Sequence, residues 1–212
     1  MIKYSHIIWD WNGTLLDDAT HAMTVMNQML KKRGMPLMAH MTDYHKAFAF
    51  PIIQYYRNVG FNFEKESFED LAVEFIEAYH VNHTGDTPLH KNVEKLLKRI
   101  NEMGITQIIL SASKQENLLL QVREFPITHY FDEILGLSDI YAKSKVEIGL
   151  DYIKNNNVEK ALLVGDSTHD YDVAKELNAD CILVSTGHQS KEALEACGVP
   201  VIDNISRIME FI

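Results

Sequence analysis

Asp10 stands at the end of a short apolar run, where its carboxylate could take part in catalysis or metal binding. The run Ile7–Trp9 precedes it, and Asn12, Gly13 and Thr14 follow. A short apolar run bounded by a turn signal is typical of a buried strand. Ligands of an open α/β sheet bind beyond the carboxyl ends of its strands, where a carboxylate can act as a nucleophile or hold a metal ion. The alternative is an ordinary strand-to-helix turn, in which the aspartate caps a helix and the glycine permits a tight bend.

Polar residues also follow two later apolar runs. Ser111 ends the run Gln107–Leu110, and Asp166 and Asp170 follow the run Ala161–Val164. Three carboxylates at adjoining strand ends would repel one another strongly without a cation, and this repulsion favours a metal site. The alternative for Asp166 and Asp170 is helix N-capping.

In their order and spacing, four segments together resemble the haloacid dehalogenase-like (HAD) hydrolase superfamily, and in particular its phosphoglycolate phosphatase-like branch with a helical cap. They are the Asp10–Thr14 segment, Ser111, a lysine before residues 146–153, and Gly165-Asp166-Ser167-x-x-Asp170. Members of this superfamily are mostly phosphatases. The resemblance runs from Ile7 to beyond Ala174.

The resemblance implies a metal and a nucleophile at the strand ends. Asp10 would attack phosphorus and form an aspartyl phosphate. Mg²⁺, which prefers oxygen ligands, would be held by Asp10, Asp166, Asp170 and the backbone carbonyl of Asn12.

The resemblance also implies a phosphate site. Ser111 would donate a hydroxyl hydrogen to a phosphate oxygen, with backbone N–H groups beside it, so Ala112, Gly13 and Thr14 are expected to line this site. A lysine would offset the charge of the transferring phosphoryl group. Lys145 directly precedes the helical pattern and is preferred to Lys143, although either could be a solvated surface cation.

Asn12 departs from the family pattern, in which a second aspartate usually stands two residues after the nucleophile. That aspartate protonates the leaving group and activates the attacking water. A neutral amide cannot do this, and general acid–base catalysis is worth roughly 10²–10⁴-fold. Metal binding through the backbone carbonyl should survive. Turnover should be slow unless the substrate has a good leaving group, such as an acyl phosphate or pyrophosphate, or unless another titratable group such as His169 stands in.

Residues 17–85 show helical spacing and no strand pattern, so we expect an all-helical cap inserted in an α/β core of residues 1–16 and 86–212. From Thr87 onward, strand and helix patterns alternate, which predicts a doubly wound parallel sheet. In the cap, His45 and Lys46 are candidate substrate contacts. Phe48 and Phe50 could exclude water or simply pack between cap helices.

The composition limits the kinds of partner that the protein is expected to bind. The formal net charge is −10, which argues against a nucleic-acid or anionic membrane surface. The two cysteines provide no disulfide framework, and no apolar run approaches the ~18 residues of a membrane span. We expect a cytoplasmic protein, monomer or homodimer, whose partner is a small phosphorylated metabolite.

The sequence therefore predicts a Mg²⁺-dependent hydrolase of small phosphate esters or anhydrides, slowed by Asn12. Two alternatives stay open. One is a phosphotransferase, and the other is a phosphometabolite-binding or regulatory protein with negligible turnover.

Overall fold

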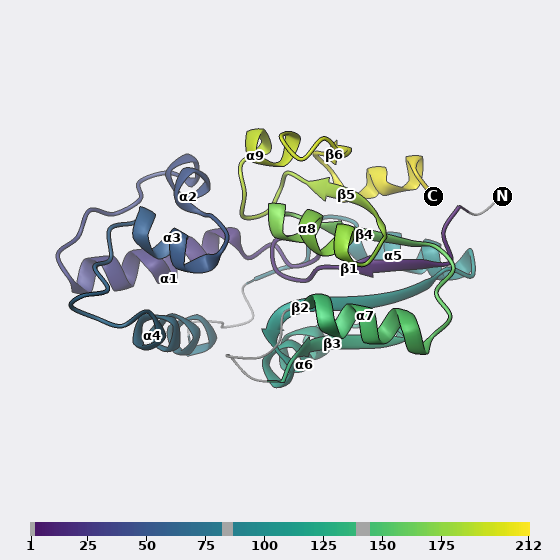
Figure 1. Ribbon diagram of the computed structural model, residues 1–212, viewed down its shortest axis with the longest axis horizontal. Helices are drawn as coiled ribbons and strands as arrows, with labels where there is room; N and C mark the ends of the chain where they lie inside the picture. The colour runs from purple at the N-terminus through teal and green to yellow at the C-terminus, as the bar shows by residue number, and fades with distance from the viewer. Residues whose placement is uncertain (1–2, 82–86, 139–144) are drawn as a thin grey trace.

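The computed structural model describes residues 3–81, 87–138 and 145–212, and the described residues form a six-stranded parallel sheet (Figure 1). The strands lie in the order β3-β2-β1-β4-β5-β6. They are β1 (His6–Trp9), β2 (Thr106–Lys114), β3 (Glu133–Leu137), β4 (Ala161–Gly165), β5 (Asp180–Val184) and β6 (Val201–Ile202). The predicted parallel α/β fold is confirmed. Because the strand order reverses beside β1, a ligand crevice is expected at its carboxyl end.

Strand register brings the polar residues of three strands to one edge. Trp9 of β1 pairs with Ile109 of β2 and with Val164 of β4, and the Asp10 backbone N–H donates to the Val164 carbonyl at 2.9 Å. Asp10, Ser111 and Asp166 therefore lie at the same edge of the sheet, although β2 itself continues beyond Ser111.

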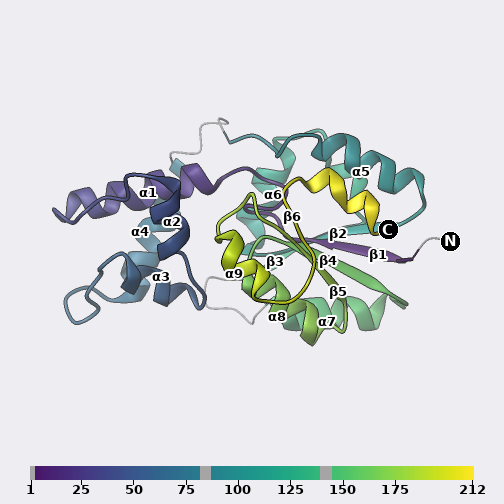
Figure 2. The ribbon, with the colours of Figure 1, turned by 90° about the horizontal axis from the view of Figure 1, so that it is seen from above.

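Helices cover both faces of the sheet, because alternate strand residues point to opposite sides. Ile7 and Trp9 belong to one buried cluster and Ile8 to the other. The first cluster includes residues of α5 (Val93–Glu102), α6 (Gln115–Arg123) and the 3₁₀ turn η2 (Ile205–Glu210); the second includes residues of α7 (Lys145–Asn155), α8 (Thr168–Glu176) and α9 (Lys191–Glu195). Figure 2 shows α5 and α7 on opposite sides of the sheet. Trp9 and Trp11 are fully buried in the first cluster.

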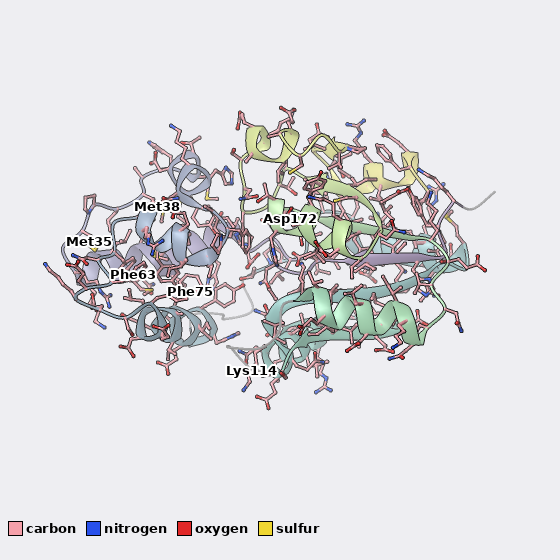
Figure 3. All side chains as sticks on the ribbon, in the orientation of Figure 1. Met35, Met38, Phe63, Phe75, Lys114 and Asp172 are labelled. Carbon is pink, nitrogen blue, oxygen red and sulfur yellow. The ribbon has the colours of Figure 1, made fainter. Side chains whose placement is uncertain are left out.

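Four helices lie beyond the carboxyl edge of the sheet, and we call them the cap (Figure 1). They are α1 (Ala19–Lys32), α2 (Met41–Ala47), α3 (Ile52–Asn58) and α4 (Phe68–Val81). They share a hydrophobic cluster of their own. Figure 3 shows Met38, Phe63 and Phe75 within the cap, whereas Lys114 and Asp172 lie on the sheet side. The exact domain boundary at residue 85 stays a prediction, because residues 82–86 lie outside the described part of the chain.

The structure differs from the sequence prediction in two local details. β2 continues past Ser111 to Lys114, where it still pairs with Leu137 of β3 after a shift in register. The alternating strands and helices end in a 3₁₀ helix and not an α-helix, and its three-residue period places both Ile205 and Ile208 in the core. Among the described residues, no helix is long and apolar enough to cross a membrane.

Candidate active site

Three buried carboxylates meet at the carboxyl edge of the sheet. Asp10 follows β1, Asp166 follows β4, and Asp170 lies in the first turn of α8. One carboxylate oxygen from each lies within 4.8 Å of the others. This oxygen-rich donor set fits a hard divalent cation. The three predicted carboxylate ligands are thus brought together, while the Asn12 carbonyl stays a predicted ligand.

Lys145 supplies positive charge inside this carboxylate cluster. Its side chain is buried, and Nζ donates to Asp10 Oδ1 at 2.8 Å and to Asp170 Oδ1 at 2.5 Å. Burial alone would lower the pKa of Lys145, but the two carboxylates raise it, so the ammonium stays charged. Lys145 thus lies where the phosphate lysine was expected. The alternative, Lys143, lies outside the described residues.

One lysine does not neutralise three carboxylates, and their pKa values differ accordingly. Burial raises the pKa of Asp10 to about 6 despite the Lys145 ammonium. Burial, with the neighbouring Asp10 and Asp170, raises the pKa of Asp166 to about 8. Burial also disfavours the charged form of Asp170, but Lys145 and Ser167 outweigh it and lower its pKa. Without a metal ion, Asp166 is therefore largely protonated at neutral pH.

The N-cap of α8 is Ser167, and Asp170 takes part in the cap as the third residue of the helix, so the capping alternative and the site assignment of Asp170 are compatible. Its Oδ2 accepts from the Ser167 hydroxyl at 2.6 Å and from the Ser167 backbone N–H at 3.0 Å. The Ser167 side chain in turn accepts from the Asp170 backbone N–H, which forms a capping box. Capping fixes one oxygen of Asp170 and leaves the other for Lys145.

The expected phosphate-site residues lie near the carboxylates, but Gly13 and Thr14, unlike Ser111 and Ala112, are not among the residues that line the pocket. The Thr14 hydroxyl lies 3.3 Å from both Asp10 Oδ2 and Asp166 Oδ1. Ser111 is buried at the end of the β2 run, and Ser111 and Ala112 line the same pocket as Asp10. Gly13 has φ +74°, and a Cβ there would collide with Asp166 and His188, so the turn requires glycine.

The Asn12 side chain is held by three hydrogen bonds. Its Oδ1 accepts from the Ser113 hydroxyl at 2.9 Å, while Nδ2 donates to Asp18 Oδ2 at 2.9 Å and to the Tyr79 hydroxyl at 3.2 Å. Asp18 also accepts from the Gly13 backbone N–H at 2.7 Å. An amide suits this position, because it donates to Asp18 and accepts from Ser113 at the same time.

His188 belongs to this site and was missed by sequence reasoning. It lies in the loop after β5, and its backbone N–H donates to Asp166. Its ring bonds to Asp18 through Nε2 at 3.3 Å and to the Tyr44 hydroxyl through Nδ1 at 2.7 Å. Burial would lower the pKa of His188, but Asp18 raises it to about 9. Conversely, burial would raise the pKa of Asp18, but His188 lowers it to about 2. In the sequence, the feature that could have indicated this role of His188 was the position of Gly187 and His188 just after the end of a strand.

The other histidine and lysine candidates lie in different places. His169 lines the pocket and stacks on Phe50 with ring centroids 4.9 Å apart. Burial lowers its pKa, so the ring is neutral at pH 7. His45 bonds to the Gly187 carbonyl at 3.1 Å and therefore joins cap to core instead of lining the pocket. Lys46 is exposed and is not among the pocket residues.

A cavity of about 530 Å³ lies between the cap and the sheet edge. Its floor includes Asp10, Asn12, Ser111, Lys145 and Asp166, and aromatic side chains of the cap form much of its wall. The arrangement can hold a phosphate group at the floor and an organic group under the cap.

We predict that divalent metal binding strengthens as pH rises from 6 to 8. Below its pKa of about 8, Asp166 carries a proton that the metal must displace, so affinity should increase by about tenfold per pH unit for each proton displaced. Titration calorimetry with Mg²⁺ in buffers of different ionisation enthalpy measures both the affinity and the proton release. Asp172→Asn, which alters an exposed residue of α8, should leave both unchanged. Affinity that is constant or falls over this range would contradict the prediction.

Comparison with known proteins agrees with this geometry. The family model described as haloacid dehalogenase-like hydrolase matches residues 7–184. A phosphoglycolate phosphatase from Rhodobacter capsulatus is 24% identical over 196 residues, covering 90% of this chain and 88% of that protein.

Solved structures share the fold. A haloacid dehalogenase-like family hydrolase from Streptococcus pneumoniae superposes with a TM-score of 0.85 at 16% identity, covering 100% of this chain and 99% of that one. The protein tyrosine kinase A (PtkA) of Mycobacterium tuberculosis superposes with a TM-score of 0.82 at 22% identity, covering 98% and 97%. With the family match spanning most of the chain, this protein belongs to the haloacid dehalogenase-like hydrolases.

Proposed function

We propose that the protein is a Mg²⁺-dependent phosphohydrolase of small phosphate esters or anhydrides that acts through an aspartyl phosphate on Asp10. The observation that carries the proposal is the cluster of Asp10, Asp166 and Asp170 around the Lys145 ammonium, at the floor of a cavity. The phosphatase name of the relative from Rhodobacter capsulatus supports the same reaction class.

Each residue at the floor has a role in this proposal. Asp10 attacks phosphorus, the bond to the leaving oxygen breaks, and water later attacks the aspartyl phosphate to release inorganic phosphate. Lys145 orients Asp10 and offsets the negative charge of the phosphoryl oxygens. Ser111 donates to one of these oxygens. When bound by the three carboxylates, Mg²⁺ supplies the charge that screens nucleophile and phosphate from each other.

Asn12 limits this chemistry, because its amide neither donates a proton to a leaving group nor takes one from water. Its three hydrogen bonds also hold the side chain in one orientation. Slow hydrolysis follows, and the phosphoryl group then has time to reach an acceptor other than water. Phosphotransfer is thus the second candidate function, and the kinase named among the similar structures favours it. A protein that binds a phosphometabolite with negligible turnover is the third.

The nucleophile is tested by phosphate release from a panel of phosphate esters, acyl phosphates and pyrophosphate with Mg²⁺. Asp10→Asn should abolish release, because the amide is a poor nucleophile. Asp172→Asn is the matched control and should keep full activity, since this residue is exposed on α8. Activity that persists in Asp10→Asn would contradict the proposal, and silence of the unaltered protein on every compound would favour the binding role.

The missing proton relay is tested by Asn12→Asp, which we expect to raise kcat by up to about 10²–10⁴-fold. The new carboxyl group would lie against the Asp18 carboxylate, since Nδ2 of Asn12 is 2.9 Å from it. A like charge raises a carboxyl pKa, which suits a general acid near neutral pH. Asn117→Asp places the same charge in the same pocket and should not raise kcat. An equal effect of the two substitutions would show that charge, and not proton transfer, is responsible.

His169 is the candidate substitute for the missing base, since it lines the pocket and is neutral at pH 7. We predict that His169→Ala lowers kcat by about tenfold or more. His129→Ala, at an exposed position outside the pocket, is the control. Unchanged kcat in His169→Ala would remove this residue from the mechanism.

A further inference from the structure

Asp18 stands at the N-cap position of α1, but its side chain makes no capping hydrogen bond to that helix. An aspartate at this position usually accepts a hydrogen bond from a backbone N–H in the first turn of its helix. Here the buried carboxylate lines the cavity and bonds to the loop after β1. Helix capping therefore does not explain why an aspartate stands at this position.

Hydrogen-bond donors from the core and from the cap meet at the Asp18 carboxylate. Its Oδ1 accepts from the Gly13 backbone N–H at 2.7 Å and lies 3.3 Å from His188 Nε2. Its Oδ2 accepts from the Tyr79 hydroxyl at 2.6 Å and from Asn12 Nδ2 at 2.9 Å. Tyr79 belongs to α4 of the cap, and His188 lies in the loop after β5. Because both oxygens are bonded on different sides, the carboxylate is held in one orientation.

Asp18 bonds to both the side chain and the backbone peptide of Asn12. The Asn12 amide donates to Oδ2, and the peptide that joins Asn12 to Gly13 donates to Oδ1 through the Gly13 N–H. This peptide is trans, and in a trans peptide the N–H and C=O groups point in opposite directions. Fixing the Gly13 N–H therefore also fixes the direction of the Asn12 carbonyl, which is the backbone ligand predicted for Mg²⁺.

Gly13 makes this external support necessary. Glycine restricts its own backbone less than any other residue, and Gly13 has φ +74°. The orientation of the two peptides beside Gly13 thus depends on the groups that bond to them. The Leu16 carbonyl also accepts from the Gly13 N–H, at 2.9 Å, and His90 Nε2 lies 3.0 Å from the Gly13 carbonyl. Of these groups, Asp18 is the one that contacts both the Gly13 N–H and the Asn12 side chain.

We propose that Asp18 is a positioning residue for the metal site, whose carboxylate fixes the Asn12–Gly13 peptide so that the Asn12 carbonyl can act as a ligand of the divalent cation. This proposal rests on the proposed function and adds a residue outside the cluster of Asp10, Asp166 and Asp170. Since Tyr79 bonds to the same carboxylate, Asp18 also joins the cap to the metal site.

Asp18→Ala tests this role through Mg²⁺ binding without substrate, measured by titration calorimetry. The variant removes both acceptors of the Asn12–Gly13 segment and costs α1 no capping bond. Mg²⁺ affinity should fall by about 10–100-fold, as it does when other residues that orient metal ligands are removed. Asp17→Ala removes the same charge at the adjacent, exposed residue and should leave the affinity unchanged. Unchanged Mg²⁺ affinity in Asp18→Ala would overturn the proposal.

Comparison of Mg²⁺ with Ca²⁺ separates ligand orientation from the loss of charge. Mg²⁺ requires near-ideal octahedral geometry, whereas Ca²⁺ accepts more flexible coordination. A displaced carbonyl should therefore weaken Mg²⁺ binding by a larger factor than Ca²⁺ binding. The loss of one negative charge would weaken the binding of both ions by the same factor. Equal losses for the two ions in Asp18→Ala would overturn the positioning role.

Tyr79→Phe is a milder variant, because Asp18→Ala also leaves the buried His188 ring without its carboxylate partner. It removes one donor to Asp18 Oδ2 and keeps the ring in the cap. We expect it to weaken Mg²⁺ binding by about fivefold, the equivalent of one hydrogen bond. Tyr55→Phe is the matched control in the cap, since the Tyr55 hydroxyl has no hydrogen-bond partner among the described residues. Equal Mg²⁺ affinities of the two variants, both folded by circular dichroism, would overturn the link through Asp18.

Phosphate release distinguishes this proposal from the proposed function. Hydrolysis by the unaltered protein, with no loss of Mg²⁺ affinity in Asp18→Ala, overturns the positioning role and leaves the phosphohydrolase intact. Weakened Mg²⁺ binding in Asp18→Ala, with no phosphate release by the unaltered protein, supports the positioning role and overturns the hydrolase. Failure of the unaltered protein to bind Mg²⁺ would overturn both.

Discussion

The electrostatic balance among three buried carboxylates and one buried lysine is the constraint on which the rest of this structure depends. Asp10, Asp166 and Asp170 are placed together by strand register and by the start of α8, and Lys145 bonds to two of them. Burial raises the pKa of Asp166 to about 8, and the neighbouring Asp10 and Asp170 carboxylates add to this rise. Three buried carboxylates beside a single lysine favour the binding of a divalent cation. A bound cation would in turn favour the binding of a phosphate dianion. Metal binding, substrate binding and the ionisation of Asp10 are thus coupled.

A second charged pair couples the cap to this cluster. Asp18 opens α1, and His188 comes from the loop after β5. Their ion pair also bonds to Tyr44 and Tyr79 of the cap and to Asn12 at the floor. Because these groups are buried, apart from the half-buried Asn12, separating cap from core would leave polar groups to be resolvated. The orientation of the Asn12 amide is therefore tied to the position of the cap.

Much of the site was predictable, since strand periodicity and strand-end position depend only on neighbouring residues. Asp10, Ser111 and Asp166 each end an apolar run, and parallel pairing brings such ends together. The partners of Asn12 were not predictable, because Asp18, Tyr79 and Ser113 come from different elements whose meeting depends on cap placement. The helical spacing of the cap residues also did not predict that His45 faces the core loop at Gly187 while Lys46 is exposed.

In the proposed reaction, Asp10 carries the phosphoryl group during turnover. Acid quenching during turnover of the best-hydrolysed compound of the phosphate panel with Mg²⁺, followed by peptide mass mapping, locates the phosphoryl group. Since Asn12 slows the attack of water, we expect a substantial fraction of the protein to carry one phosphoryl group, on the peptide that contains Asp10. Phosphate release without any labelled protein, or a label on another residue, would contradict the account.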